Sequence, residues 1–311
     1  MNALEKTLGT MGNLTFEPDK QRQDILKEIE KITETRIGVY IANPNVSPNF
    51  IDHNDLMFFN DVLESIGVVE KLDIIIDSPG GDGNIAETLA VMCREFSKDL
   101  RSIVIKSAKS AATMWAISTD EILMGYISEI GPTDPQIMIF TSDGRSTFVP
   151  AQSIINGVGQ LHAMLNSGIH PRIVMTLANK IEPSILDVAN NAIAFSKDFA
   201  FRWLSEHMLK GKDDKAKEIA EALSDQRIWL SHGKRIGIKE AKKLGLKIKI
   251  IKKDSKLWKL LWEYYCRAQI MMNNTGNAKL FETSSMGIKV QATVRRRRPS
   301  QQPDSETQPI E

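Results

Sequence analysis

Short apolar runs alternate with helical segments between residues 36 and 124. The apolar runs cover 36–42, 72–77, 102–107 and 121–124, and the intervening helical segments are 54–66, 84–98 and 110–118. In segment 84–98, apolar residues are spaced three and four positions apart, which is typical of an amphipathic helix. Apolar strands that alternate with helices favour a parallel sheet covered on both faces. The pattern therefore predicts an α/β fold.

The rest of the chain divides into segments of different character. A hairpin is predicted at 136–140 with 146–149, helices at 19–33, 151–178, 182–210, 214–223 and 238–244, a strand at 246–251 and an aromatic-rich segment at 257–272. The domain boundaries that we predict are 1–35 for an N-terminal helical arm outside the core, 36–210 for the core domain, 211–294 for a C-terminal extension packing on the core or on a neighbouring subunit, and 295–311 for a disordered basic and polar tail.

Composition excludes several classes of protein. The chain has 311 residues, 42% of them hydrophobic, so it can bury a full core. A net charge of +1 favours neither a nucleic acid nor a membrane surface as partner. Cys93 and Cys266 are far apart in sequence and fit no metal spacing. We expect no metal, and separately we expect no cofactor. No apolar run approaches the roughly 18–20 residues that span a bilayer, and no secretory signal is visible. These observations predict a soluble cytoplasmic protein.

A glycine-rich corner lies where the strand at 72–77 ends and the next helix begins. Its sequence, residues 77–83, reads D-S-P-G-G-D-G. Gly80 and Gly81 permit positive φ and close approach to the backbone, and the helix start adds free N–H groups. The corner is therefore a candidate oxyanion cradle, or else an ordinary turn between strand and helix. Residues 81–86 also match the dinucleotide pattern G-x-G-x-x-A, but no acidic residue ends the following strand.

A second corner, at residues 107–113, carries a candidate nucleophile. Small residues after the strand at 102–107 allow a tight turn that exposes Ser110 at a helix N-terminus. There the helix dipole favours negative charge, and the N–H of Ala111 can donate to an oxyanion. The arrangement follows the logic of a nucleophile elbow, although G-x-S-x-G is absent. The alternative is a serine that only caps the helix.

Four motifs in this order resemble the serine dehydrogenase proteinase family. They are D-S-P-G-G at 77–81, A-K-S-A-A-T at 108–113, D-E-I-L-M-G at 120–125 and G-P-T-D-P-Q at 131–136. The family belongs to the Clp/crotonase fold, alongside signal peptide peptidase A and the Clp proteolytic subunit, and the resemblance covers roughly residues 36–285. It implies a Clp/crotonase-like fold of stacked ββα units with additional C-terminal helices, and a peptide-binding groove.

The resemblance also implies roles for individual residues. Ser110 would be the nucleophile, and the N–H groups of Gly81 and Ala111 would form the oxyanion hole, with Gly80 shaping the loop. In related Ser-Lys enzymes a lysine on a later helix is the general base, and Lys180 is the best positional match. Such a lysine must be neutral to accept a proton.

Two residues of the motif G-P-T-D-P-Q are expected to act on the substrate. Asp134 and Gln136 are predicted to position the strand that binds the substrate peptide.

Three departures from the related enzymes bear on this assignment. Lys109 precedes the nucleophile where the Clp subunit and the signal peptide peptidases have a small residue, so it is a family-specific feature or a charge that faces the substrate. The segment between Ser110 and Lys180 is longer than in the simplest dyad enzymes. No histidine lies where the Clp subunit has one. Among the histidines elsewhere in the chain, His232 has the best claim as an alternative base, because it lies in the family-like segment 230–237.

The leading hypothesis is a serine peptidase that cleaves peptides or unfolded proteins through an acyl-enzyme on Ser110. By resemblance we expect a homo-oligomer, and we expect no nucleic-acid partner. One alternative is a crotonase-like acyl-thioester enzyme that uses the oxyanion hole without a nucleophile. Another is a non-catalytic oligomeric scaffold of the same fold.

Overall fold

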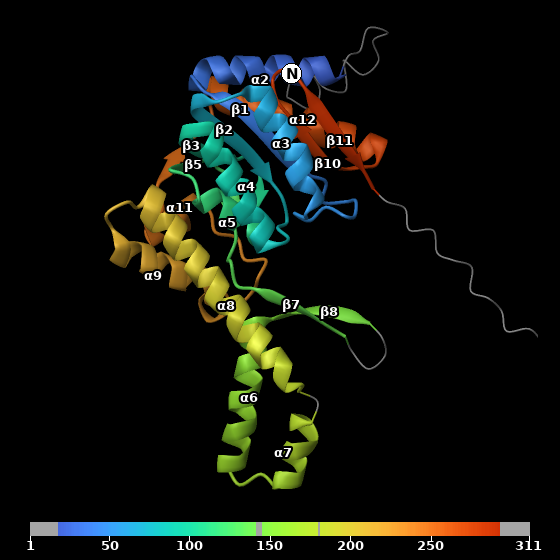
Figure 1. Ribbon diagram of the computed structural model, residues 1–311, viewed down its shortest axis with the longest axis vertical. Helices are drawn as coiled ribbons and strands as arrows, with labels where there is room; N and C mark the ends of the chain where they lie inside the picture. The colour runs from blue at the N-terminus through green and yellow to red at the C-terminus, as the bar shows by residue number, and fades with distance from the viewer. Residues whose placement is uncertain (1–17, 141–144, 180, 293–311) are drawn as a thin grey trace, which may run out of the picture.

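A seven-stranded sheet forms the centre of the computed structural model, which describes residues 18–140, 145–179 and 181–292 (Figure 1). In spatial order its strands are β11 (Gly287–Gln291), β10 (Asn277–Glu282), β1 (Arg36–Ala42), β2 (Val69–Asp77), β3 (Ser97–Val104), β5 (Glu121–Met124) and β9 (Ile248–Ile250). The strands from β1 to β9 run parallel, whereas β10 and β11 are antiparallel. The predicted α/β class is confirmed.

Helices cover both faces of this sheet. On one face lie α3 (Asn54–Ile66), α4 (Gly83–Phe96) and α5 (Ala111–Ile117), and on the other α2 (Pro18–Thr33) and α12 (Lys256–Thr275). Neighbouring residues of β2 serve opposite faces, as side-chain alternation along a strand requires. Ile74 and Ile76 belong to the cluster under α3–α5, and Ile75 belongs to the cluster under α2 and α12. Burial on both faces explains why β2 reads as a continuous apolar run.

The first described helix corrects an expectation. Its bounds are close to the predicted 19–33, but it does not lie outside the core, because Leu26 and Ile29 are fully buried in the cluster beneath α12. The polar composition of this segment concealed the apolar stripe that faces the sheet. The predicted aromatic-rich segment supplies the other side of this layer, since Trp258 and Tyr264 are buried there.

The antiparallel edge formed by β10 and β11 was not predicted. Two charged residues, Lys279 and Glu282, interrupt the apolar pattern of β10, and both are buried. Lys279 forms ion pairs with Asp52 at 2.6 Å and with Asp55 at 2.7 Å. A strand that buries compensated charges has no apolar alternation for sequence analysis to detect.

The middle of the chain forms elements beyond the sheet. They are the hairpin β7 (Gln136–Phe140) and β8 (Ser146–Pro150), the helices α6 (Ala151–Asn166), α7 (Pro171–Ala178), α8 (Pro183–Trp203), α9 (Asp213–Ser224), α10 (Gln226–Trp229) and α11 (Ile238–Leu244), and a π-helical turn (Leu204–Met208). The antiparallel pairing of β7 with β8 confirms the predicted hairpin. In Figure 1, α6 and α7 extend away from the sheet at the far end of α8.

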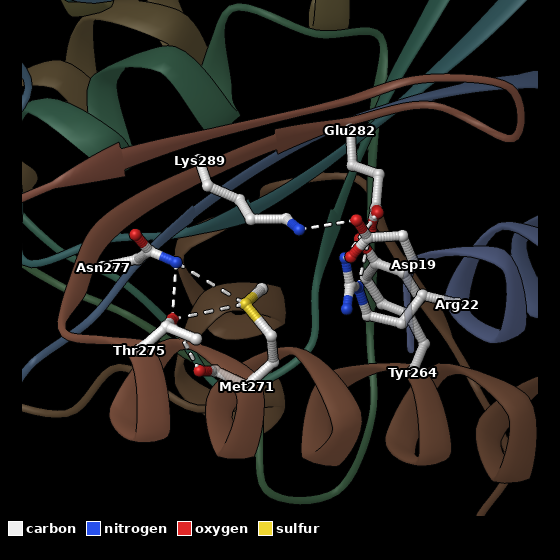
Figure 2. A network of polar contacts seen from close by, with 8 residues as sticks. All are labelled: Asp19, Arg22, Tyr264, Met271, Thr275, Asn277, Glu282 and Lys289. Carbon is white, nitrogen blue, oxygen red and sulfur yellow. Dashed lines mark hydrogen bonds and ion pairs between the residues drawn. The ribbon is translucent and has the colours of Figure 1, made fainter. Parts of the chain in front are cut away.

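A buried polar network joins the two ends of the described chain (Figure 2). Arg22 of α2 donates to both carboxylate oxygens of Glu282 in β10, at 3.0 and 2.8 Å, and the Tyr264 hydroxyl donates to the same carboxylate at 2.6 Å. Burial raises the pKa of Glu282, and the guanidinium of Arg22 opposes that shift. Asp19 pairs with Arg22 at 2.7 Å and with Lys289 of β11. The network fixes α2 to the antiparallel edge.

We expect Arg22→Met to lower the free energy of unfolding by about 3–5 kcal/mol, because it leaves the buried Glu282 carboxylate without its positively charged partner. Urea unfolding measures the change. The matched control is Lys27→Met, which removes an ion pair with Asp24 in which both side chains are exposed, and which we expect to cost no more than about 0.5 kcal/mol. A similar small effect of both variants would contradict the role of the network.

Candidate active site

The structure brings the two corners together at the carboxyl ends of β2 and β3. The Ser78 N–H donates to the carbonyl of Ser107, and the Lys109 N–H donates to the carbonyl of Ser78, both at 3.0 Å. These two bonds form a parallel bridge between Ser78 and Ala108. The glycine corner and the serine corner therefore begin side by side, joined as neighbouring strands are.

Only glycine fits at Gly80 and Gly81. Gly80 has φ 107°, and a methyl group built there would lie 2.7 Å from Ser110 Cβ and 3.2 Å from the Ala111 nitrogen. Gly81 has φ 150°, and a methyl group there would collide with the backbone of Ile51. The two glycines thus let the backbone approach Ser110 and Ile51 at the same time.

Ser110 occupies a strained turn between β4 (Ser107–Ala108) and α5. Its backbone has φ 51° and ψ −121°, a region that non-glycine residues rarely adopt. Although Ser110 sits at the helix N-cap position, its side chain makes no capping hydrogen bond. A strained backbone at a serine between a strand and a helix is also a feature of a nucleophile elbow.

Two backbone N–H groups near Ser110 remain unused. Ile51 donates to the carbonyl of Gly80 at 2.8 Å and accepts from Asp82 at 3.0 Å, a pairing that does not use the Gly81 N–H. Within the described part of the chain, neither Gly81 nor Ala111 has an acceptor for its N–H. The Gly80 N–H, in contrast, donates to Ser78 Oγ at 3.1 Å. The N–H groups of Gly81 and Ala111 therefore remain available to a bound ligand, whereas that of Gly80 does not.

A cavity of about 670 Å³ opens over these groups. Its polar lining includes Ser110, Gln136, Ser196 and His232, and its apolar lining includes Phe50, Ile51, Met114, Phe148 and Phe195. The cavity is large enough for several peptide side chains.

His232 enters this cavity as part of a hydrogen-bonded chain. Its Nδ1 lies 2.9 Å from Oδ1 of Asp134, whose side chain is only 2% exposed, and Gln136 Nε2 donates to Oδ2 at 3.0 Å. An ionised carboxylate can only accept, so a proton on Nδ1 would be donated to Asp134, and Nε2 is the ring nitrogen left to act on a substrate. That arrangement suits a ring which removes a proton at Nε2.

Three adjoining backbone segments carry Ser110, Asp134 and His232. Ser110 follows β4, and Asp134 follows β6 (Glu129–Ile130), which pairs in parallel with β4. His232 precedes Ile236, which exchanges two backbone hydrogen bonds of 3.0 Å with Ile130. One short ladder of strands therefore brings the three segments side by side.

The predicted site residues have different outcomes. Ser110, Gly80, Gly81 and Ala111 lie together, and Asp134 and Gln136 lie beside them. Lys180, the predicted base, falls outside the described residues. His232 was expected only as an alternative base, because Lys180 is the better positional match to the related Ser-Lys enzymes. The pairing of His232 with Asp134 joins positions 98 residues apart, so no local pattern reveals it. The available signals were the motif Ser231-His232-Gly233 and the aspartate in G-P-T-D-P-Q.

The comparisons with known proteins give the family. The family model for ClpP-like SDH-type serine proteinases matches residues 19–278. Because this match covers most of the chain, the protein belongs to that family, and the expected resemblance and fold class are confirmed.

Two relatives come from Methanocaldococcus jannaschii. The uncharacterized protein MJ0137 is 30% identical over 191 residues, which is 60% of this chain and 58% of the relative. The uncharacterized protein MJ1495 is 28% identical over 180 residues, 57% of this chain and 51% of the relative. The chain thus spans less than two thirds of either relative.

The chain is also similar to solved structures at low sequence identity. A serine-to-alanine mutant of the 1510-N membrane-bound stomatin-specific protease has 16% identity and a TM-score of 0.40, covering 68% of this chain and 79% of that one. The ClpP catalytic domain from Plasmodium falciparum has 15% identity and a TM-score of 0.36, covering 75% and 91%. In the part of this chain that the structure describes, no helix is long and apolar enough to cross a membrane.

The Asp77 side chain accepts a hydrogen bond from the backbone of the serine corner. One carboxylate oxygen accepts from the Ser107 N–H at 2.9 Å, and the other accepts from Gln269 of α12 at 3.4 Å. Burial raises the pKa of Asp77 from 3.8 to about 6, because its charged form is poorly solvated there. The C-terminal helix α12 thus contributes to the support of the site.

The raised pKa predicts how Asp77 changes stability with pH. The folded chain binds the Asp77 proton more tightly than the unfolded chain does, so this stabilisation is present below pH 3.8 and is lost as pH rises through about 6. Relative to Asp77→Asn, the wild type should lose about 3 kcal/mol of unfolding free energy between pH 3.5 and 7.5. Urea unfolding across that range measures the difference, and parallel curves for the two proteins would contradict it.

Proposed function

We propose that the protein is a serine peptidase that hydrolyses peptide bonds through an acyl-enzyme on Ser110. The observation that supports this proposal is the bridge between Ser78 and Ala108, because it brings the turn that carries Ser110 next to the turn of Gly80 and Gly81. Membership of a serine proteinase family supports the same conclusion. The apolar lining of the cavity, which includes Met114 and Phe195, suits a peptide or an unfolded protein as substrate.

Each group has a role in the proposed reaction. Ser110 Oγ attacks the carbonyl carbon of the peptide bond, and the N–H groups of Gly81 and Ala111 donate to the oxyanion that forms. His232 Nε2 takes the serine proton and then gives it to the leaving amine. Water attacks the resulting ester, again with His232 as the base. Asp134 holds the ring and stabilises the imidazolium during each transfer.

This proposal prefers His232 over Lys180 as the base. His232 shares a cavity with Ser110 and has a buried carboxylate on Nδ1, whereas a lysine would first have to lose its proton. The Ser110–Lys180 dyad stays a prediction, to be compared with His232 by mutation.

The nucleophile is tested with a fluorophosphonate probe. The wild type should be labelled at Ser110, and Ser110→Ala should lose the label together with at least 1,000-fold of the activity on an unfolded protein, about 4 kcal/mol of activation free energy. The control is Ser231→Ala, which removes an exposed serine one residue from His232 and should keep both. Equal labelling of wild type and Ser110→Ala would sink the assignment. Acyl-thioester turnover that survives Ser110→Ala would favour the crotonase-like alternative.

The base is identified by comparing three variants in kcat. We expect His232→Gln to lower kcat by a factor of about 1,000 or more and Asp134→Asn by about 100 to 10,000, while Lys180→Met stays within about threefold of wild type. The exposed His162 offers a control, since His162→Gln should leave kcat unchanged. An inactive Lys180→Met beside a fully active His232→Gln would instead establish the Ser-Lys dyad.

Self-association and a cytoplasmic location stay predictions. Exposed apolar side chains on α7, with Ile173 56% and Met175 61% exposed, support self-association through the helices that extend from the sheet. Sedimentation measurements test the oligomeric state.

A further inference from the structure

Lys109 precedes the nucleophile, yet it does not line the cavity that Ser110 faces. Its side chain is only 15% exposed, and Nζ forms an ion pair with Glu129 at 2.8 Å. The same nitrogen donates to the backbone carbonyls of Ile130 and Lys234, each at 3.3 Å. The three donors of the ammonium group therefore each have an acceptor, and the charge does not face a substrate.

The surroundings of Lys109 are shaped to receive it. A methyl group built at Gly131 would lie 2.8 Å from Lys109 Cδ, so the glycine leaves room for the lysine stem. Glu129, the charge partner, also pairs with Arg235 at 3.2 Å. Lysine, glutamate and arginine form a small cluster at the junction of three segments.

Those three segments carry the three proposed catalytic side chains. Lys109 is adjacent to Ser110, Glu129 and Ile130 form the strand that leads to Asp134, and Lys234 lies two residues after His232. The backbone bridge at Ile236 fixes only the far end of the segment with His232.

The other end of that segment, which precedes His232, is exposed to solvent. Leu230 is 82% exposed and has φ 61°. A side chain that reaches the Lys234 carbonyl therefore restrains the segment close to His232.

We propose that Lys109 is a positioning residue that holds the His232 segment against the strands carrying Ser110 and Asp134. The inference rests on the proposed function for its catalytic meaning, while the physical link rests on the contacts alone. Removing the ammonium group frees the Lys234 carbonyl and lets His232 move relative to Ser110. Proton transfer depends steeply on that distance, so kcat falls while substrate binding is retained.

The test compares Lys109→Met, which keeps the length of the side chain, with Lys109→Arg, which keeps the charge and the donors. Lys109→Met should lower kcat at least tenfold with KM within about threefold, and Lys109→Arg should recover kcat to within about threefold of wild type. Titration of Ser110 with the fluorophosphonate probe gives the concentration of folded sites. Because kcat is calculated per folded site, a variant that only unfolds in part keeps its kcat. The control Lys98→Met removes an exposed pair with Glu70 and should leave kcat unchanged.

Hydrogen exchange tests the physical link without relying on activity. Amides of residues 231–235 should exchange at least tenfold faster in Lys109→Met than in wild type, and unchanged exchange overturns the inference. If Lys109→Met does not fold, Glu129→Gln serves instead and should show the same direction in exchange and kcat, whereas wild-type values in that variant overturn the inference.

The two proposals fail in different ways. Wild-type protein without labelling at Ser110 overturns the proposed function, and the exchange measurement still decides whether Lys109 holds the segment. Labelling at Ser110 with a wild-type kcat in Lys109→Met overturns only the role of Lys109.

Discussion

Two backbone hydrogen bonds hold the proposed active site together. They run between Ser78 and its partners Ser107 and Lys109, past the point where β2 and β3 end. Each strand turns sharply after the bridge, one into the glycines and the other into Ser110. The bridge fixes the two turns at strand spacing, and a methyl group built at Gly80 would lie 2.7 Å from Ser110 Cβ and 3.2 Å from the Ala111 nitrogen. We propose that the Ser110 hydroxyl and the N–H groups of Gly81 and Ala111 act on the same carbonyl group. Preorganised donors of this kind provide most of the stabilisation of an oxyanion, since they need not move during the reaction.

The same bridge explains several features that otherwise look unrelated. Gly80 must lack a side chain because Ser110 Cβ lies against it, and Asp77 is buried at an energetic cost because it holds the Ser107 N–H. The C-terminal helix α12 reaches this carboxylate through Gln269. Residues 277–282, next to α12, are locked into the sheet by buried charges. The C-terminal region thus belongs to the support of the site and not only to the surface of the core.

The sequence was sufficient for the parts of the fold that follow local rules. The helices and parallel strands between residues 36 and 124 were predicted within a few residues, and so was the pairing of the hairpin at 136–150, because apolar spacing and turn residues specify them. The convergence of Ser110 with Gly80 and Gly81 was also predictable, since both follow strands of one sheet.

Contacts distant in sequence were not predictable in this way. The strand β10 was missed because Lys279 and Glu282 are compensated by residues more than 200 positions away, at Asp55 and Arg22. The pairing of His232 with Asp134 was missed for the same reason, as was the contact between Lys109 and the Lys234 carbonyl. In each case a polar or charged side chain is paired with a residue far away in the sequence, and no local sequence pattern identifies that residue.

The most direct measurement is a crystal structure of the protein with a phosphonate bound covalently to Ser110. We expect a phosphoryl oxygen within about 2.7–3.1 Å of the nitrogens of both Gly81 and Ala111, with His232 Nε2 on the side of Ser110 Oγ. An adduct whose oxygen points into solvent, while Gly81 and Ala111 bind other groups, would contradict the claim that the two corners form one oxyanion site.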